Sequence, residues 1–104
     1  MHSYSFKRGE QTLHCKTNVK NGLINNIIFL HGLASNASRW RELMNTTELR
    51  KDTRLMAMDL RGHGQSTTFK HYSRQHWCDD VQTLITQLTG TTILAGHSMG
   101  AQIA

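Results

Sequence analysis

Thr92-Ile93-Leu94-Ala95-Gly96-His97-Ser98-Met99-Gly100 is the stretch that decides the fold, because it sets a short apolar run directly before a G-x-S-x-G pattern. The residues after it, Ala101 to Ala104, are typical of a helix start. A chain that turns sharply from a strand into a helix holds the serine between them in a strained conformation, and flanking glycines leave room for the turn. The pattern predicts an exposed, nucleophilic Ser98 close to unpaired backbone N–H groups at a helix start.

Two other apolar runs have the same design. Ile27 to Leu30 and Leu55 to Met58 are each followed by a polar loop that contains glycine. Continuous apolar runs of this length are typical of strands buried on both faces, as in a parallel sheet covered by helices. Together with Thr92 to Ala95, they predict three buried strands.

Helical patterns lie between these runs. Arg39 to Met44 is a short candidate, and a longer one has Ser73 as its predicted N-cap and Gly90 as its predicted stop. The longer pattern carries an apolar stripe at helical spacing, formed by Trp77, Val81, Leu84, Ile85 and Leu88. Asp79-Asp80 is expected on the solvated side or near the start of this helix. Alternation of strands and helices predicts an α/β fold.

The first residues predict an edge hairpin. Tyr4 to Arg8 and Gln11 to Lys16 are short extended stretches separated by Gly9-Glu10, and Asn21-Gly22 predicts a later turn. The chain of 104 residues is expected to hold one partial domain, 1–104. Its fold class is α/β, with a mostly parallel sheet, an antiparallel edge hairpin and flanking helices.

Composition excludes several classes of protein. No apolar run approaches the ~20 residues of a membrane span, and the N-terminus has no apolar signal segment, so the expected location is cytoplasmic. The net charge is +5, but Lys and Arg are scattered in runs no longer than two, so nucleic acid is not an expected partner.

Metal and disulfide chemistry are also not expected. Cys15 and Cys78 form no C-x-x-C pattern and are interpreted as ordinary buried or half-buried thiols. His71 and His76 are five residues apart, which fits one helical face poorly, and there is no H-E-x-x-H. The sequence therefore predicts no metal site.

The order of these motifs resembles the α/β-hydrolase superfamily over Ile27 to Ala104. A buried strand is followed by His31-Gly32 and Trp40, then by D-L-R-G-H-G-Q-S at 59–66, an amphipathic helix and G-H-S-M-G at 96–100. The resemblance is closest to esterases, lipases and carbon-carbon-bond hydrolases, which carry serine in the elbow. Ser98 argues against epoxide hydrolases and haloalkane dehalogenases, which use aspartate at that point.

The resemblance implies the N-terminal half of an α/β-hydrolase fold and a serine hydrolase acting on a small-molecule ester or related acyl bond, carbon-carbon bonds included, without a cofactor. It implies Ser98 as nucleophile and the backbone N–H groups of Leu33 and Met99 as the oxyanion hole. The elbow and its loops would be supported by His31, Gly32, Gly96, His97 and Gly100. The family order places the catalytic acid and histidine beyond residue 104, so the chain alone is expected to be inactive.

Alternatives remain at this point. His97 is a poor candidate for the base, because the elbow turns adjacent side chains apart, and Asp59 is a poor candidate for the acid, because its usual family role is to hold its loop. The alternative function is a non-catalytic α/β-hydrolase-like binding protein. The sequence leaves the substrate, any lid and the oligomeric state open.

Overall fold

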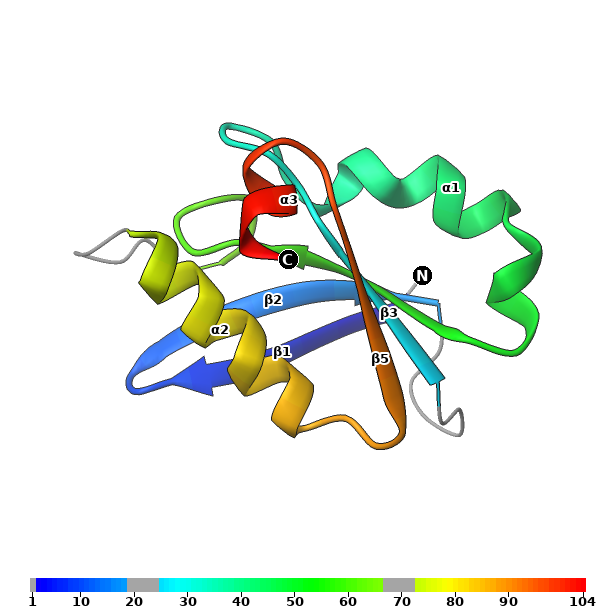
Figure 1. Cartoon of the computed structure of the whole chain (residues 1–104), viewed down its shortest axis with the longest axis horizontal. Helices are drawn as coiled ribbons and strands as arrows, with labels where there is room; N and C mark the ends of the chain where they lie inside the picture. The colour runs from blue at the N-terminus through cyan, green and yellow to red at the C-terminus, as the bar shows by residue number, and fades with distance from the viewer. Residues whose placement is uncertain (1, 19–24, 67–72) are drawn as a thin grey trace.

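A five-stranded sheet with helices on both sides forms the molecule (Figure 1). The computed structural model describes residues 2–18, 25–66 and 73–104. Strand order across the sheet is β1-β2-β4-β3-β5. The elements are β1 (His2–Arg8), β2 (Gln11–Thr17), β3 (Asn25–Leu30), η1 (Ala37–Trp40), α1 (Arg41–Thr46), η2 (Glu48–Lys51), β4 (Arg54–Asp59), α2 (Arg74–Thr86), β5 (Thr91–Gly96) and α3 (Met99–Ile103).

The predicted hairpin is confirmed. Strands β1 and β2 pair antiparallel, with Arg8 opposite Gln11, and β2 continues antiparallel onto β4. Gly9 has φ +62°, a left-handed conformation that glycine adopts without steric cost in the tight turn. The turn predicted at Asn21-Gly22 lies outside the described residues.

Three parallel strands form the other half of the sheet. Strand β3 pairs in parallel with β4 on one side and with β5 on the other, so that Leu30 lies opposite both Met58 and Gly96. The carboxyl ends of all three strands therefore lie at one edge of the sheet. The loops that follow them, which carry the predicted site residues, meet at that edge.

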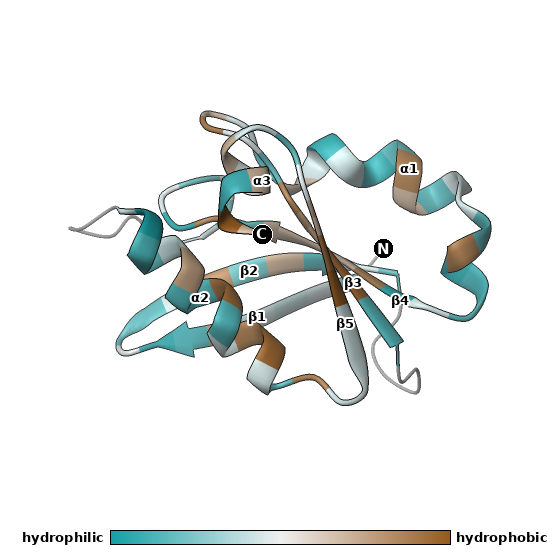
Figure 2. Cartoon of the chain, in the orientation of Figure 1, coloured by the Kyte–Doolittle hydropathy of each residue, from teal (hydrophilic) through white to brown (hydrophobic). Residues whose placement is uncertain are grey.

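Side chains of the parallel strands alternate between two apolar cores. On β3, Ile28 and Leu30 pack with apolar side chains of α2 and α3, while Phe29 packs on the opposite face against η1 and α1. Figure 2 shows the central part of β5 coloured as apolar. Both cysteines are free thiols; Cys15 is buried and Cys78 half-buried, as expected. The predicted α/β class is confirmed.

Strand β5 differs from the prediction of a strand buried on both faces. It pairs only with β3 among the described residues, and Ile93 is 58% exposed. An edge strand has one open side, so its side chains lack the neighbours that cover those of β3 and β4. In the described part of the chain, no helix is both long and apolar enough to cross a membrane.

Two helix boundaries also differ. Ser73 caps α2 as predicted, its hydroxyl accepting the His76 N–H, but the helix ends at Thr86 and not near Gly90. Gly90, at φ +81°, instead forms the turn into β5. The candidate at Arg39 to Met44 is a 3-10 turn, η1, followed by the α-helix Arg41–Thr46.

Candidate active site

Ser98 lies in the turn between β5 and α3, with φ 56° and ψ −117°. A residue with a side chain rarely adopts this left-handed φ, so the surrounding contacts have to hold the strain. They include the bond from the His97 N–H to the Leu30 carbonyl, 3.0 Å, and the bond from the Ala101 N–H to the Ser98 carbonyl, 3.0 Å. Ser98 itself is exposed to solvent. The turn thus presents the hydroxyl at the carboxyl edge of the sheet.

The two elbow glycines allow close approach of backbone segments. A Cβ on Gly96 would lie 2.5 Å from the Ala101 nitrogen. A Cβ on Gly100 would lie 2.7 Å from the His31 carbonyl oxygen and against the Leu30 carbonyl oxygen. Separations below 3.0 Å do not occur for real Cβ atoms, so both positions require glycine for α3 to pack on β5 and β3.

The loop after β3 lies against the elbow. A Cβ on Gly32 would be 3.3 Å from the Cβ of Ser98, so this loop and the serine are in contact range. The loop turns at Leu33 and Ala34: the Ser35 N–H donates to the Gly32 carbonyl, 3.2 Å, and Ala34 has φ 61°. Met99 is the first residue of α3, where backbone N–H groups have no partner inside the helix. The structure therefore brings Gly32, Ser98 and Met99 together.

His31 joins the loops after β3 and β4. Its side chain is fully buried; Nε2 accepts the Leu60 N–H at 3.0 Å, and Nδ1 contacts the Gly32 carbonyl at 2.6 Å. These partners fix the neutral tautomer with the proton on Nδ1, because Nε2 has to accept. Burial lowers the pKa of His31; the Gly32 carbonyl opposes this effect, and the nearby His63 imidazole adds to it.

This lowered pKa predicts a pH dependence of stability. Below the unfolded pKa of about 6.5, the unfolded chain binds a proton at His31 that the folded protein excludes. The free energy of unfolding should therefore fall with pH below about 6.5, by up to about 1.4 kcal/mol per pH unit from this residue. Urea unfolding at pH 7.5 and 5.5 should show a smaller pH effect in His31→Gln than in the wild type. The same pH effect in both proteins would contradict the assignment.

Four other described histidines, His14, His63, His76 and His97, contact groups other than Ser98. His97 Nε2 lies 3.2 Å from Arg39 Nη2. His63 accepts the Ala34 N–H and contacts the Arg61 carbonyl, His14 contacts Asp59, and His76 contacts Ser73. His71 lies outside the described residues. Within those residues, no hydrogen bond joins a histidine to the Ser98 hydroxyl.

Asp59 holds together the segments after β3 and β4. It is 3% exposed; Oδ1 accepts the Ala37 N–H at 2.7 Å, and Oδ2 accepts the Gln65 N–H at 3.0 Å and contacts His14 Nδ1 at 3.1 Å. A Cβ on Gly64 would lie 2.6 Å from Oδ2, so the glycine lets the loop close on the carboxylate. Both oxygens are bonded within this loop region.

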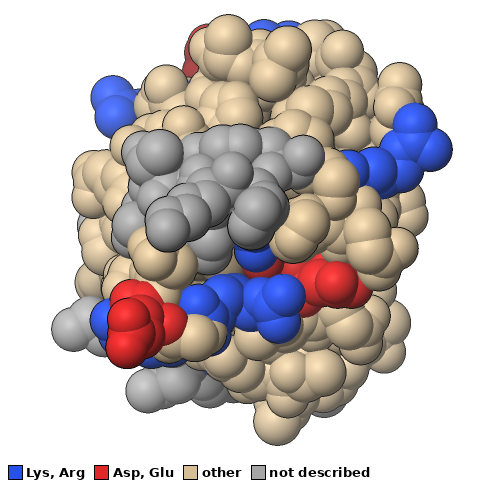
Figure 3. All heavy atoms as spheres, turned by 90° about the vertical axis from the view of Figure 1, so that its left-hand side faces the viewer, with Lys and Arg blue, Asp and Glu red and all other residues tan. Residues whose placement is uncertain are grey.

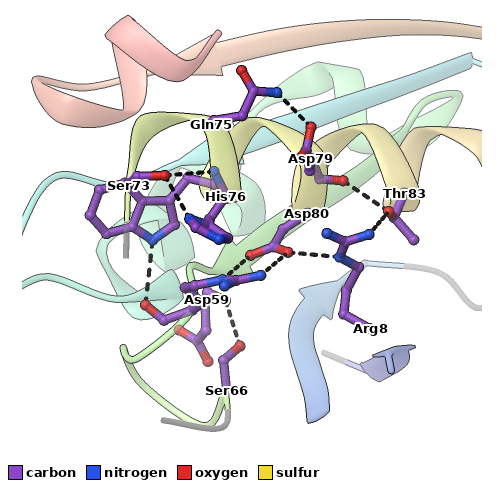
Figure 4. Close-up of polar contacts among 11 residues, drawn as sticks. Arg8, Asp59, Ser66, Ser73, Gln75, His76, Asp79, Asp80 and Thr83 are labelled. Carbon is purple, nitrogen blue, oxygen red and sulfur yellow. Dashed lines mark hydrogen bonds and ion pairs between the residues drawn. The ribbon is translucent and has the colours of Figure 1, made fainter. Parts of the chain in front are cut away.

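The prediction that Asp79-Asp80 lies on the solvated side or near the start of the helix is wrong for Asp80. Asp80 is fully buried, and Arg61 reaches it with two bonds, Nε to Oδ2 at 2.7 Å and Nη2 to Oδ1 at 2.7 Å. Arg8 Nε donates to Oδ1 at 3.0 Å, as Figure 4 shows. Asp79 is half-exposed and accepts a bond from Gln75. A buried carboxylate has to be paired. Position 80 lies on the same helical stripe as Trp77 and Leu84, and this spacing is a signal of burial that the sequence analysis did not use.

We expect Asp80→Asn to destabilise the protein by about 3 kcal/mol, because Arg61 would remain buried without its carboxylate partner. Asp79→Asn makes the same change of charge one residue away at a half-exposed site and should change stability by less than about 0.5 kcal/mol. Chemical denaturation of the two variants measures the difference. Equal losses in both would show that Asp80 acts only through the charge of the helix.

Charge is dispersed on the face of the molecule that Figure 3 shows. On the face that Figure 3 shows, Lys and Arg side chains lie at separate places, several of them beside Asp or Glu. The described residues contain no group of three or more His, Cys, Asp or Glu side chains placed to hold a metal ion. The expected absence of a nucleic-acid partner stays a prediction.

Comparison with known proteins agrees with this geometry. The model of the alpha/beta hydrolase family matches residues 27–104. The chain is 34% identical over 79 residues to the sn-1-specific diacylglycerol lipase ABHD11 of Mus musculus, covering 75% of this chain and 26% of the lipase. It is 38% identical over 78 residues to the 2-(acetamidomethylene)succinate hydrolase of Mesorhizobium japonicum, covering 73% of this chain and 27% of that hydrolase. The chain thus spans about a quarter of the length of these relatives.

Solved structures share the fold. A putative hydrolase from Rickettsia typhi superposes with a TM-score of 0.89 at 24% identity, over 99% of this chain and 41% of the other. The thioesterase domain from the curacin biosynthetic pathway gives 0.86 at 24% identity, over 100% and 39%. Because the family model matches three quarters of this chain, the chain belongs to the alpha/beta hydrolase family.

Proposed function

We propose that this chain supplies the nucleophile and the oxyanion donors of a serine hydrolase that cleaves a carboxylic ester or a related acyl bond, carbon-carbon bonds included, in a small-molecule substrate. The observation that carries the proposal is the strained, exposed Ser98 at the start of α3 with the Gly32 loop against it. Relatives named as a diacylglycerol lipase and as a protein phosphatase methylesterase support acyl-bond hydrolysis.

The chemistry follows from the positions of these groups. Ser98 Oγ attacks the carbonyl carbon, and the negative charge moves onto the carbonyl oxygen of a tetrahedral intermediate. The backbone N–H groups of Leu33 and Met99 are proposed to donate to that oxygen, next to the positive end of α3. His31 and Asp59 fix the loop after β3, which carries the Leu33 donor. The proposed mechanism uses no cofactor. The proposed location of the protein is the cytoplasm.

A base has to take the proton from Ser98, and no described histidine is hydrogen-bonded to it; His31, His63 and His97 are bonded elsewhere. We place the histidine and its carboxylate partner in further segments, which agrees with the share of the relatives' length that the chain spans. The protein in which residues 1–104 are joined to those segments is called the complete hydrolase below.

Ester turnover tests whether the base of Ser98 lies outside residues 1–104. The complete hydrolase should hydrolyse short-chain 4-nitrophenyl esters, while residues 1–104 alone should stay at the rate of their Ser98→Ala variant, because Ser98 without a base is a weak nucleophile. Enzymatic turnover by residues 1–104 alone, abolished by Ser98→Ala, would show that a base lies within them.

The second candidate function is a non-catalytic α/β-hydrolase-like binding protein. It is favoured by one observation, the lack of a histidine bonded to Ser98 among the described residues. A fluorophosphonate, which reacts with activated serines, separates the two functions when applied to the complete hydrolase. Stoichiometric labelling supports the hydrolase, and no labelling supports the binding protein.

A further inference from the structure

An open hollow of about 560 Å³ lies beside the elbow and has no role in the chemistry described above. Its walls come from η1, α1 and the residue that precedes the nucleophile, and they consist of Arg39, Trp40, Glu42, Leu43, Thr46 and His97. A Cβ on Gly32 would lie 3.3 Å from the Cβ of Ser98 and 3.7 Å from His97 Nδ1, so the nucleophile and the His97 wall of the hollow border the same loop residue. One substrate molecule could therefore reach both.

Among the described residues that line the hollow, Arg39 is the only Lys or Arg. Its Nη2 lies 3.2 Å from His97 Nε2, which makes the imidazole nitrogen an acceptor and orients the guanidinium toward the elbow. No ion pair joins Arg39 to a carboxylate in the part of the chain that the structure describes. Most of its five N–H donors therefore remain available in the exposed hollow.

The backbone on both sides of Arg39 is anchored. The Ala37 N–H donates to buried Asp59 at 2.7 Å, and the Trp40 ring stacks on Phe29 with centroids 4.9 Å apart. Asn36 caps η1 by accepting the Ser38 N–H. The guanidinium thus extends from a fixed turn, which reduces the entropy lost when it binds a ligand.

We propose that Arg39, oriented by His97, binds a carboxylate of the substrate, so that the hydrolase acts on esters of acidic, carboxylate-bearing molecules. A planar guanidinium matches a carboxylate with two parallel N–H···O bonds, which a neutral ester group cannot reproduce at the same strength. Glu42 lies in the same lining and competes electrostatically with an anionic substrate. This inference rests on the proposed function, because it assigns the substrate class to the same site.

The test compares two substrates of the complete hydrolase, the 4-nitrophenyl monoester of glutaric acid, which has a free carboxylate, and 4-nitrophenyl pentanoate, which is neutral. Arg39→Gln should lower the ratio of kcat/KM values, acidic over neutral ester, about tenfold or more, which corresponds to the loss of a charge-assisted hydrogen bond. Arg39→Lys should retain part of the ratio, and Glu42→Gln should raise it.

Arg41→Gln is the matched control. It removes the same charge two residues away, from a side chain that does not line this hollow, and should leave the ratio within about twofold. The proposal is overturned if Arg39→Gln slows both esters by the same factor, or if Arg41→Gln lowers the ratio as much as Arg39→Gln does.

A different result would overturn the proposed function itself: neither ester is turned over by the wild type, or turnover survives Ser98→Ala. In that case glutarate binding, measured by titration calorimetry, decides the carboxylate site alone. Saturable binding that is lost in Arg39→Gln and kept in Arg41→Gln supports the site, and no binding to the wild type overturns it.

Discussion

Replacing Ser98 with alanine in the complete hydrolase is expected to lower kcat for ester hydrolysis by about 10³- to 10⁶-fold. The alanine variant retains the Gly32 loop and the start of α3 but lacks the Ser98 hydroxyl that is proposed to attack the carbonyl. Only transition-state stabilisation by the backbone donors would remain, and it acts on a far weaker nucleophile, water. Steady-state kinetics on 4-nitrophenyl esters measure the loss.

Folding should be almost unaffected by this change, because Ser98 is exposed and its hydroxyl forms no hydrogen bond to a described side chain. Removing the hydroxyl should leave the thermal midpoint within about 2 °C of the wild type. Ser5→Ala, at an exposed serine on β1, is the matched control and should keep full activity. Equal fluorophosphonate labelling of wild type and Ser98→Ala would contradict the role of Ser98.

Features that depend on neighbouring residues in the sequence could be predicted from it. The hairpin around Gly9-Glu10, the strands ending at Leu30 and Asp59, and the cap at Ser73 all arise from local patterns of apolar, turn and capping residues. The end of α2 could not be found in this way. Leu88 continues the apolar stripe and packs on the core although it lies beyond the helix, because the chain is already reversing toward β5.

In the candidate site too, local patterns could be predicted from the sequence, whereas contacts between distant residues could not. The turn around Ser98 is a local motif, so its sequence predicted its geometry. The pairs Arg61–Asp80 and Arg39–His97 join residues 19 and 58 positions apart, and the folded topology brings them together. The helical position of Asp80 gave a usable signal. Nothing near Arg39 in the sequence indicates that it contacts the elbow.

Replacing Gly100 with valine is expected to abolish activity and to destabilise the protein by more than about 3 kcal/mol. The first added carbon would overlap the carbonyl oxygens of Leu30 and His31, which are backbone atoms and cannot rotate away as a flexible side chain could. Helix α3 would have to move off the end of β3. That movement would displace Met99 and the Ser98 hydroxyl from the Gly32 loop, so stability and catalysis should be lost together.

Ala101→Val distinguishes this collision from a general effect of a branched residue in α3. Ala101 is the next residue in the helix and is exposed, so valine there should cost less than about 1 kcal/mol and keep most of the activity. Urea unfolding and ester kinetics on the two variants provide the comparison. If Gly100→Val were as stable and as active as Ala101→Val, α3 would not approach β3 as closely as the structure shows. The strained turn that exposes Ser98 would then need another explanation, since its geometry depends on that close approach.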